Sequence, residues 1–226
     1  MATRLVLVEL VAGFEGRTST AVVIESVGGV DAAKRVQAGE AFDVVILASE
    51  AIDKLLAGGH LLAASKVDLM RSGVSIAVRA GVTLPDISTP QALRRAVMAS
   101  SSISYSTGPS GVALARLFEH WGIDDEIKDR IVPAPPGVPV GSLVARGEAE
   151  LGFQQTSELM HLEGITVVGP LPAEIQVITT FSAGIGARSR HAEAVRALLQ
   201  DMNSAPARAT KIKQGMQPMP DPMPDQ

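Results

Sequence analysis

Residues 103–111, ISYSTGPSG, contain five hydroxyl side chains and two glycines, and an apolar run with helical spacing follows them. The first N–H groups of a helix have no partner within the helix, and the positive end of the helix dipole lies there, so such a start favours an anion. Pro109 fixes one backbone dihedral, and Ser110 stands where an N-cap residue is expected. The stretch predicts an anion site; the alternative is an ordinary capped turn whose extra hydroxyls are solvated.

A second turn, SVGG at residues 26–29, repeats this arrangement between a predicted strand at 19–26 and a predicted helix. Gly28 and Gly29 would let a ligand approach the backbone, and Asp31 could cap the helix. Neither turn contains Arg or Lys, although Arg often binds carboxylate and phosphate groups. We therefore expect neutral donors around an oxyanion, or a weakly charged ligand.

Three ionisable residues could do acid–base chemistry beside these turns: Glu25, Glu50 and Tyr105. A carboxylate and a phenol can together move a proton on a small acid. If residues 19–26 form a strand, its alternation places Glu25 and Ser26 on opposite faces, so both cannot point at one ligand.

Other chemical motifs are absent from the sequence. The four histidines lack the spacing of metal ligands, and no G-x-S-x-G elbow, phosphate loop or dinucleotide fingerprint occurs. We predict neither a metal nor a cofactor.

The elements that position these residues are predicted from composition and periodicity. Hydrophobic residues make up 46% of the 226 residues and aromatics only 3%, so Ala, Val, Leu and Ile must fill the core. Short β-rich runs alternate with amphipathic ones, which indicates an α/β fold with a mostly parallel sheet. Strands are predicted at 19–26, 42–49, 72–81, 101–106, 151–155 and 175–181, and helices at 27–39, 50–59, 91–100, 110–120, 142–150, 157–164, 190–203 and 204–216.

The first residues allow two interpretations. Residues 4–8 could be a strand, but no turn signal follows them. We favour a helix over 2–15, with Leu7, Leu10, Val11 and Phe14 on one stripe.

Two changes of composition suggest where the chain passes between lobes. Prolines follow Gly81, and a long β-branched run begins near Ile175. We predict lobe I from residues 1–81 and 175–226 and lobe II from residues 82–174, with a tail at 217–226 that is too rich in proline to fold alone.

Four stretches together resemble a known family: residues 22–49, 86–123, 142–159 and 167–185. They are similar to the type II periplasmic binding protein fold in its molybdate-binding-protein-like branch, and the phrase VARGEAELGF is the most specific part. The resemblance covers nearly the whole chain after about residue 20. It implies two Rossmann-like α/β lobes joined by two crossover strands, with a small anion held between them by hinge closure.

Carried over by position, the resemblance implies a set of ligand-binding residues with hydroxyl and backbone donors. They are Ser26, Gly28, Gly29, Val30, Ser49, Ser106, Thr107, Ser110, Gly111 and Gln155. The sequence departs from the family at its start, where no first strand or donor loop is found before Glu9. That strand and loop are absent, or the reading frame begins upstream of Met1.

The resemblance implies a solute-binding protein for a molybdate-like oxyanion or a small organic acid, working with an ABC importer permease. The fold also resembles aconitate isomerase, so the alternative is an isomerase or tautomerase of a small organic acid that uses Glu25, Glu50 and Tyr105. We expect a binding protein rather than an enzyme, and a monomer.

Charge and hydropathy exclude several other classes. The formal net charge is −4 with no basic block, which argues against nucleic acid or an anionic membrane surface as a partner. No run approaches the ~20 apolar residues of a membrane span. The resemblance implies a periplasmic location. Because Glu9 interrupts the first apolar run, no signal peptide is predicted, and a cytoplasmic location is the alternative.

Overall fold

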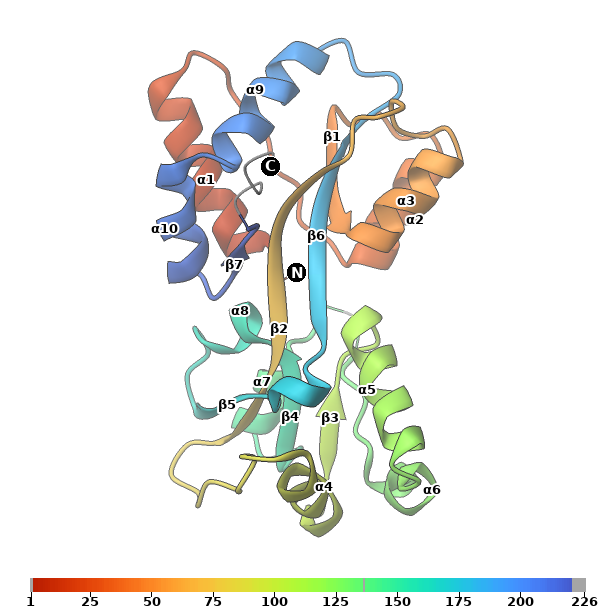
Figure 1. Cartoon of the computed structure of the whole chain (residues 1–226), viewed down its shortest axis with the longest axis vertical. Helices are drawn as coiled ribbons and strands as arrows, with labels where there is room; N and C mark the ends of the chain where they lie inside the picture. Colours follow the sequence, from red (N-terminus) through yellow and green to blue (C-terminus); the bar gives the residue numbers. More distant parts are fainter. Residues whose placement is uncertain (1, 136, 221–226) are drawn as a thin grey trace, which may run out of the picture. The chain divides into compact units, whose positions relative to one another are not determined.

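The computed structural model describes residues 2–135 and 137–220, and its contacts divide the chain into two compact units (Figure 1). Unit 1 comprises residues 3–72 and 180–226, and unit 2 comprises residues 73–179. The chain passes between them within two strands, β2 (Val67–Arg79) and β6 (Ile178–Ile185). The first part of unit 1 thus ends at residue 72 and its second part begins at residue 180, whereas composition suggested residues 81 and 175. Most of the predicted proline-rich tail, residues 221–226, lies outside the described residues.

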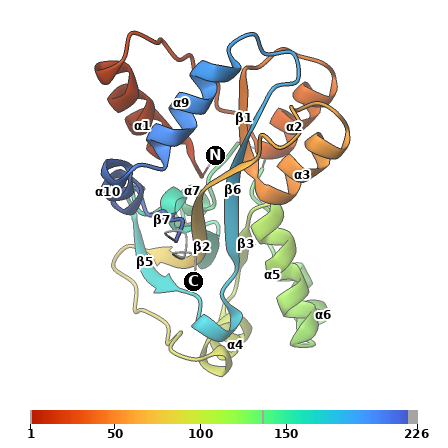
Figure 2. The same cartoon turned by 45° about the horizontal axis from the view of Figure 1, so that its top comes forward.

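Unit 1 contains a small sheet and two groups of helices. Strand β1 (Val44–Ala48) runs antiparallel to β6, with Val44 opposite Ile185, and β7 (Gln217–Pro218) pairs with β2. Figures 1 and 2 show one group of helices beside β1 and the other grouped away from it. The first group is α2 (Gly29–Gln37) and α3 (Ser49–Ala57); the second is α1 (Arg4–Arg17), α9 (Ala192–Met202) and α10 (Ala205–Lys213).

The helix predicted at the start of the chain is confirmed. Helix α1 buries Leu7, Leu10, Val11 and Phe14, as the stripe predicted. It packs against α9 and α10, and Lys213 Nζ donates to Glu9 Oε1 at 2.8 Å. A helix with one buried stripe therefore begins the described chain.

The strand predicted at residues 19–26 is wrong. Residues 20–28 form neither helix nor strand, and the side chain of Val23 is 93% exposed. Strand propensity depends on a neighbouring strand that pairs the backbone, and no described strand pairs with this segment. Strand alternation therefore does not place Glu25 and Ser26 on opposite faces.

Unit 2 is built on a mixed sheet. Strand β3 (Ile103–Tyr105) is parallel to β4 (Leu151–Gln155), whereas β2 is antiparallel to both β4 and β5 (Ile165–Pro170). The described pairings are thus mainly antiparallel, contrary to the expected mostly parallel sheet. The helices are α4 (Pro90–Ala99), α5 (Pro109–His120), α6 (Asp124–Ile127), α7 (Val140–Ala145) and α8 (Thr156–Leu159), with short 3₁₀ turns at η1 (Lys128–Arg130) and η2 (Ala173–Ile175).

The core of unit 2 lies between this sheet and helices α4 and α5. Val, Leu and Ile side chains fill most of it, as the low aromatic content predicted. Phe118 is its central aromatic, since its ring lies 6.0 Å from Tyr105 and 5.9 Å from Phe153. Thr89 caps α4, because Ala92 N donates to Thr89 Oγ1 at 3.1 Å. Within the described ranges, no helix has both the length and the apolar character needed to cross a membrane.

Candidate functional site

The turn between β3 and α5 in unit 2 brings three of the predicted residues together. The hydroxyls of Ser106 and Ser110 lie 3.3 Å apart, and Thr107 is exposed beside them. Helix α5 begins at Pro109, so Gly108 is the N-cap residue and no side chain caps the helix. The prediction that Ser110 is the N-cap is wrong, because Gly108, two residues earlier, occupies that position. Its hydroxyl faces Ser106 instead.

Gly111 is fixed by packing in this turn. A Cβ atom on Gly111 would lie 1.6 Å from the carbonyl oxygen of Ser106 and 3.3 Å from Cδ2 of Tyr105. Only glycine therefore lets the first turn of α5 pack directly on Ser106. The free N–H groups of this first turn and the two hydroxyls form a set of neutral donors suited to an oxyanion.

The end of β4 lies at the same edge of the unit 2 sheet. Strands β3 and β4 are parallel, with Tyr105 opposite Phe153, so Ser106, directly after β3, and Gln155, the last residue of β4, both lie at carboxyl ends of strands. Gln155 is buried, and its Nε2 donates to Thr179 Oγ1 at 2.9 Å. Its amide oxygen is buried without a partner among the described residues. Ligand contact by Gln155 stays a prediction.

A polar network that was not predicted from the sequence lies beside Gln155. The hydroxyls of Ser75 and Thr156 lie 2.7 Å apart, and Thr156 Oγ1 donates to the carbonyl oxygen of Gly73 at 3.1 Å. Gln154 Oε1 and Ser157 Oγ are buried without partners among the described residues. The polar run QQTS directly after a buried strand was the available signal.

Burial raises the pKa values of Tyr105 and Glu158 in unit 2. Burial, followed by the charge of Glu119, raises the pKa of Tyr105, so its phenol remains protonated at neutral pH. Burial also raises the pKa of Glu158 in α8, while a hydrogen bond from Gln154 opposes the shift. Tyr105 was predicted from the sequence as a residue that could do acid–base chemistry, whereas Glu158 was not predicted.

Unit 1 places the remaining predicted residues at the starts of α2 and α3. Gly28 is the N-cap of α2, Gly29 is its first residue, and the exposed residues Ser26 and Val30 flank them. A Cβ atom on Gly29 would lie 3.9 Å from Leu47 Cδ2, so α2 begins close to the carboxyl end of β1. Ser49 follows β1 directly as the first residue of α3.

Asp31 does not cap α2. It lies in the first turn of the helix, whose N-cap is Gly28 and which has no side-chain cap. The acidic candidates in unit 1 differ in their contacts: Arg35 Nη2 donates to Glu25 Oε2 at 2.7 Å, whereas Glu50 is exposed in the first turn of α3. Glu25 is therefore an ion-paired carboxylate, in contrast to Glu50.

Two surface cavities lie in unit 1, away from these residues. One of about 90 Å³ is lined by residues that include Phe42, His60 and Arg188, and one of about 570 Å³ lies beside Leu199 and Asn203. Neither contains a predicted site residue. Within residues 2–135 and 137–220, no group of three or more His, Asp or Glu side chains could hold a metal ion.

Comparison with known proteins shows the family to which this chain belongs. The model of the family described as bacterial extracellular solute-binding protein matches residues 1–217. The chain therefore belongs to this family. It is 42% identical over 189 residues to an aconitate isomerase from Pseudomonas sp., covering 82% of this chain and 71% of the relative.

Solved structures define the fold as that of type II periplasmic binding proteins, with molybdate-binding proteins among the neighbours. The periplasmic molybdate-binding protein of Azotobacter vinelandii has a TM-score of 0.79 at 23% identity, with 97% of this chain and 96% of that chain covered. The substrate-binding domain of a molybdenum ABC transporter, described as putative, from Clostridium difficile has a TM-score of 0.77 at 15% identity, with 97% and 96% covered. These structures confirm the fold class predicted from the sequence.

Proposed function

We propose that this protein is a solute-binding protein for a small organic acid of the aconitate class. The turn after β3 carries the proposal, because it gathers two hydroxyls and the free N–H groups of α5 around Ser106 without a cationic side chain. Neutral donors of this kind can bind a carboxylate through charge-assisted hydrogen bonds. Unit 1 would add the starts of α2 and α3, and the two units would close on the ligand by a hinge motion.

The ligand class follows from similarity and not from the donors, since a tetrahedral oxyanion could use the same groups. Molybdate-binding proteins share the fold with this chain at 15% and 23% identity. The aconitate isomerase is 42% identical over 189 residues, which supports an organic acid. As a member of an extracellular solute-binding family, the protein would work in the periplasm and deliver its ligand to an ABC importer permease.

A second candidate function is isomerisation of the bound acid. Aconitate isomerises when a base removes a proton from its CH₂ group, the double bond shifts, and an acid returns a proton to the carbon at the far end of the allylic system. The phenol of Tyr105, kept protonated by burial, suits the acid. Glu50 has no ion pair among the described residues and suits the base, in contrast to the paired Glu25.

One pair of experiments tests both functions. Calorimetric titration with trans-aconitate, cis-aconitate, molybdate, sulfate and phosphate should give binding of an aconitate and none of molybdate. Binding of molybdate alone would refute the choice of ligand. Proton NMR of the bound acid in D₂O should show deuterium entering the CH₂ group if the protein is an isomerase; binding without exchange would leave the solute-binding function alone.

Two serine variants provide a matched comparison. Ser106→Ala should weaken aconitate binding about tenfold, because it removes one charge-assisted hydrogen bond. Ser101→Ala is the control, since Ser101 is exposed and its hydroxyl donates to Glu150 in the same unit.

A further inference from the structure

The segment formed by residues 19–28 carries the predicted ligand residues Ser26 and Gly28, yet little holds it in place. None of its residues is buried, and it forms no helix or strand. Within the segment, the backbone N–H groups with described partners are those of Thr20, bound to Thr18 Oγ1 at 3.4 Å, and Val22, bound to Glu15 Oε1 at 2.7 Å. Segments with so few buried contacts open locally at low free energy.

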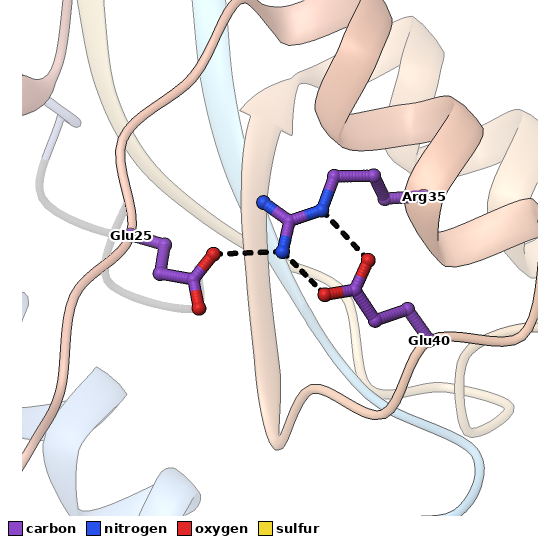
Figure 3. A network of polar contacts seen from close by, with 3 residues as sticks. All are labelled: Glu25, Arg35 and Glu40. Atoms are coloured by element: carbon purple, nitrogen blue, oxygen red, sulfur yellow. Dashed lines mark hydrogen bonds and ion pairs between the residues drawn. The ribbon is translucent and has the colours of Figure 1, made fainter.

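An ion pair at Glu25 joins this segment to helix α2 of unit 1. Figure 3 shows the Arg35 guanidinium between Glu25 on the segment and Glu40 after α2. Arg35 Nη2 donates to Glu25 Oε2 at 2.7 Å, and Glu25 immediately precedes Ser26. Fixing Glu25 therefore restricts the position of the Ser26 hydroxyl.

The guanidinium is itself oriented by two further contacts. Arg35 Nε donates to Glu40 Oε2 at 2.7 Å, and Nη2 also donates to Glu40 Oε1, so the pair is bidentate. The guanidinium lies over the ring of Phe42 at 5.0 Å. Glu40 N donates to the carbonyl oxygen of Arg35 at 3.1 Å, which keeps the two residues together. The fork is thus preorganised before Glu25 binds it.

We propose that Arg35 is a positioning residue: through Glu25 it holds the 19–28 segment so that the turn at residues 26–29 is ready for the ligand. The role in ligand binding rests on the proposed function, whereas the restraint of the segment does not. Two consequences follow. Glu25 serves to anchor the segment and not as the catalytic base, and the anchor is a solvent-accessible ion pair that salt weakens, because the Debye length falls from about 8 Å at 0.15 M to about 3 Å at 1 M.

The absence of cysteine from the sequence makes a direct test possible. A nitroxide at Val23→Cys, a position 93% exposed, reports the motion of the segment, and one at Val112→Cys, 49% exposed on α5, is the control position. In the ligand-free protein, Arg35→Gln and Glu25→Gln should each shorten the rotational correlation time at residue 23 about twofold. The double variant should match the single ones.

The control variant is Lys66→Gln, which removes the ion pair between Lys66 and Asp53 in the same unit and should leave the label at residue 23 unchanged. Raising NaCl to about 1 M should mobilise the label in the parent and not in Arg35→Gln. An unchanged rotational correlation time at residue 23 in Glu25→Gln would overturn the proposal even if Arg35→Gln fails to fold. The proposal would also be overturned if Lys66→Gln shortened this correlation time as much as Glu25→Gln does.

Titration with trans-aconitate tests the second half of the proposal. Arg35→Gln should bind about three- to tenfold more weakly, because the binding-ready position of the turn becomes less populated. Lys66→Gln should bind like the parent. Equal affinity of Arg35→Gln and the parent would overturn the role in binding. A parent protein that binds no aconitate would contradict the proposed function, while the label measurements would still decide whether Arg35 holds the segment.

Discussion

Replacing Gly111 by alanine should destabilise unit 2 and displace the turn after β3. The added Cβ would lie 1.6 Å from the carbonyl oxygen and 2.7 Å from the carbonyl carbon of Ser106, both backbone atoms. Neither atom can move without shifting β3 or the first turn of α5. Overpacking of this kind costs about 1–3 kcal/mol, and a clash with backbone belongs at the upper end. We expect a loss of about 3 kcal/mol, which lowers the melting temperature of a unit of this size by roughly 12–24 °C.

Gly108→Ala is the matched control three residues away. Its φ of −82° suits any residue, and the nearest atom to an added Cβ is Ser106 Oγ at 3.8 Å, an ordinary contact. Its free energy of unfolding should fall by about 1 kcal/mol or less, because the only expected loss is that alanine is a poorer N-cap than glycine. Urea unfolding followed by the fluorescence of Trp121, the single tryptophan, in unit 2, reports both variants. Equal stability of Gly111→Ala and Gly108→Ala would refute the described packing of Ser106 on α5.

Three further predictions concern single side chains. Burial, with a contribution from the charge of Arg208, lowers the pKa of Lys211 from 10.5 to about 8. Because the unfolded state then binds more protons than the folded state above pH 8, the free energy of unfolding should rise by about 1–2 kcal/mol between pH 7.5 and 9.5. Urea unfolding at the two pH values measures this rise, which should be smaller in Lys211→Met. Tyr105→Phe should keep affinity for aconitate but lower any deuterium exchange about 100-fold by NMR, and unchanged exchange would exclude the phenol as the acid. Thr89→Ala should lower the free energy of unfolding by about 1 kcal/mol in urea because Ala92 N loses its cap, and no loss would contradict that hydrogen bond.

Local sequence signals predicted most elements but not the partners of their side chains. The stripe from Leu7 to Phe14 predicted α1, since helix periodicity is a property of the segment itself. The strand at 19–26 was wrong, because a β-rich composition forms a strand only beside another strand. The hydrophobic periodicity of residues 19–26 contains no information on whether another strand lies beside them.

In the candidate site, too, local features were predicted from the sequence and contacts between distant residues were not. The hydroxyl-rich turn at Ser106 and the diglycine turn at Gly28 were found from residue types alone, because helix starts have recognisable composition. The N-cap of α5 was predicted at Ser110 and lies at Gly108, two residues earlier, which is a typical error at helix boundaries. The bond between Ser75 and Thr156 joins residues 81 positions apart, and only strand register brings them together.

The central claim is that a small carboxylate binds at the turn after β3, and backbone amide chemical shifts of the ¹⁵N-labelled protein test it most directly. On addition of trans-aconitate, the account predicts the largest shifts at residues 106–112, with further shifts at residues 26–30. It predicts small shifts around the cavity lined by His60 and Arg188. Shifts confined to that cavity, or none at saturating aconitate, would contradict the account.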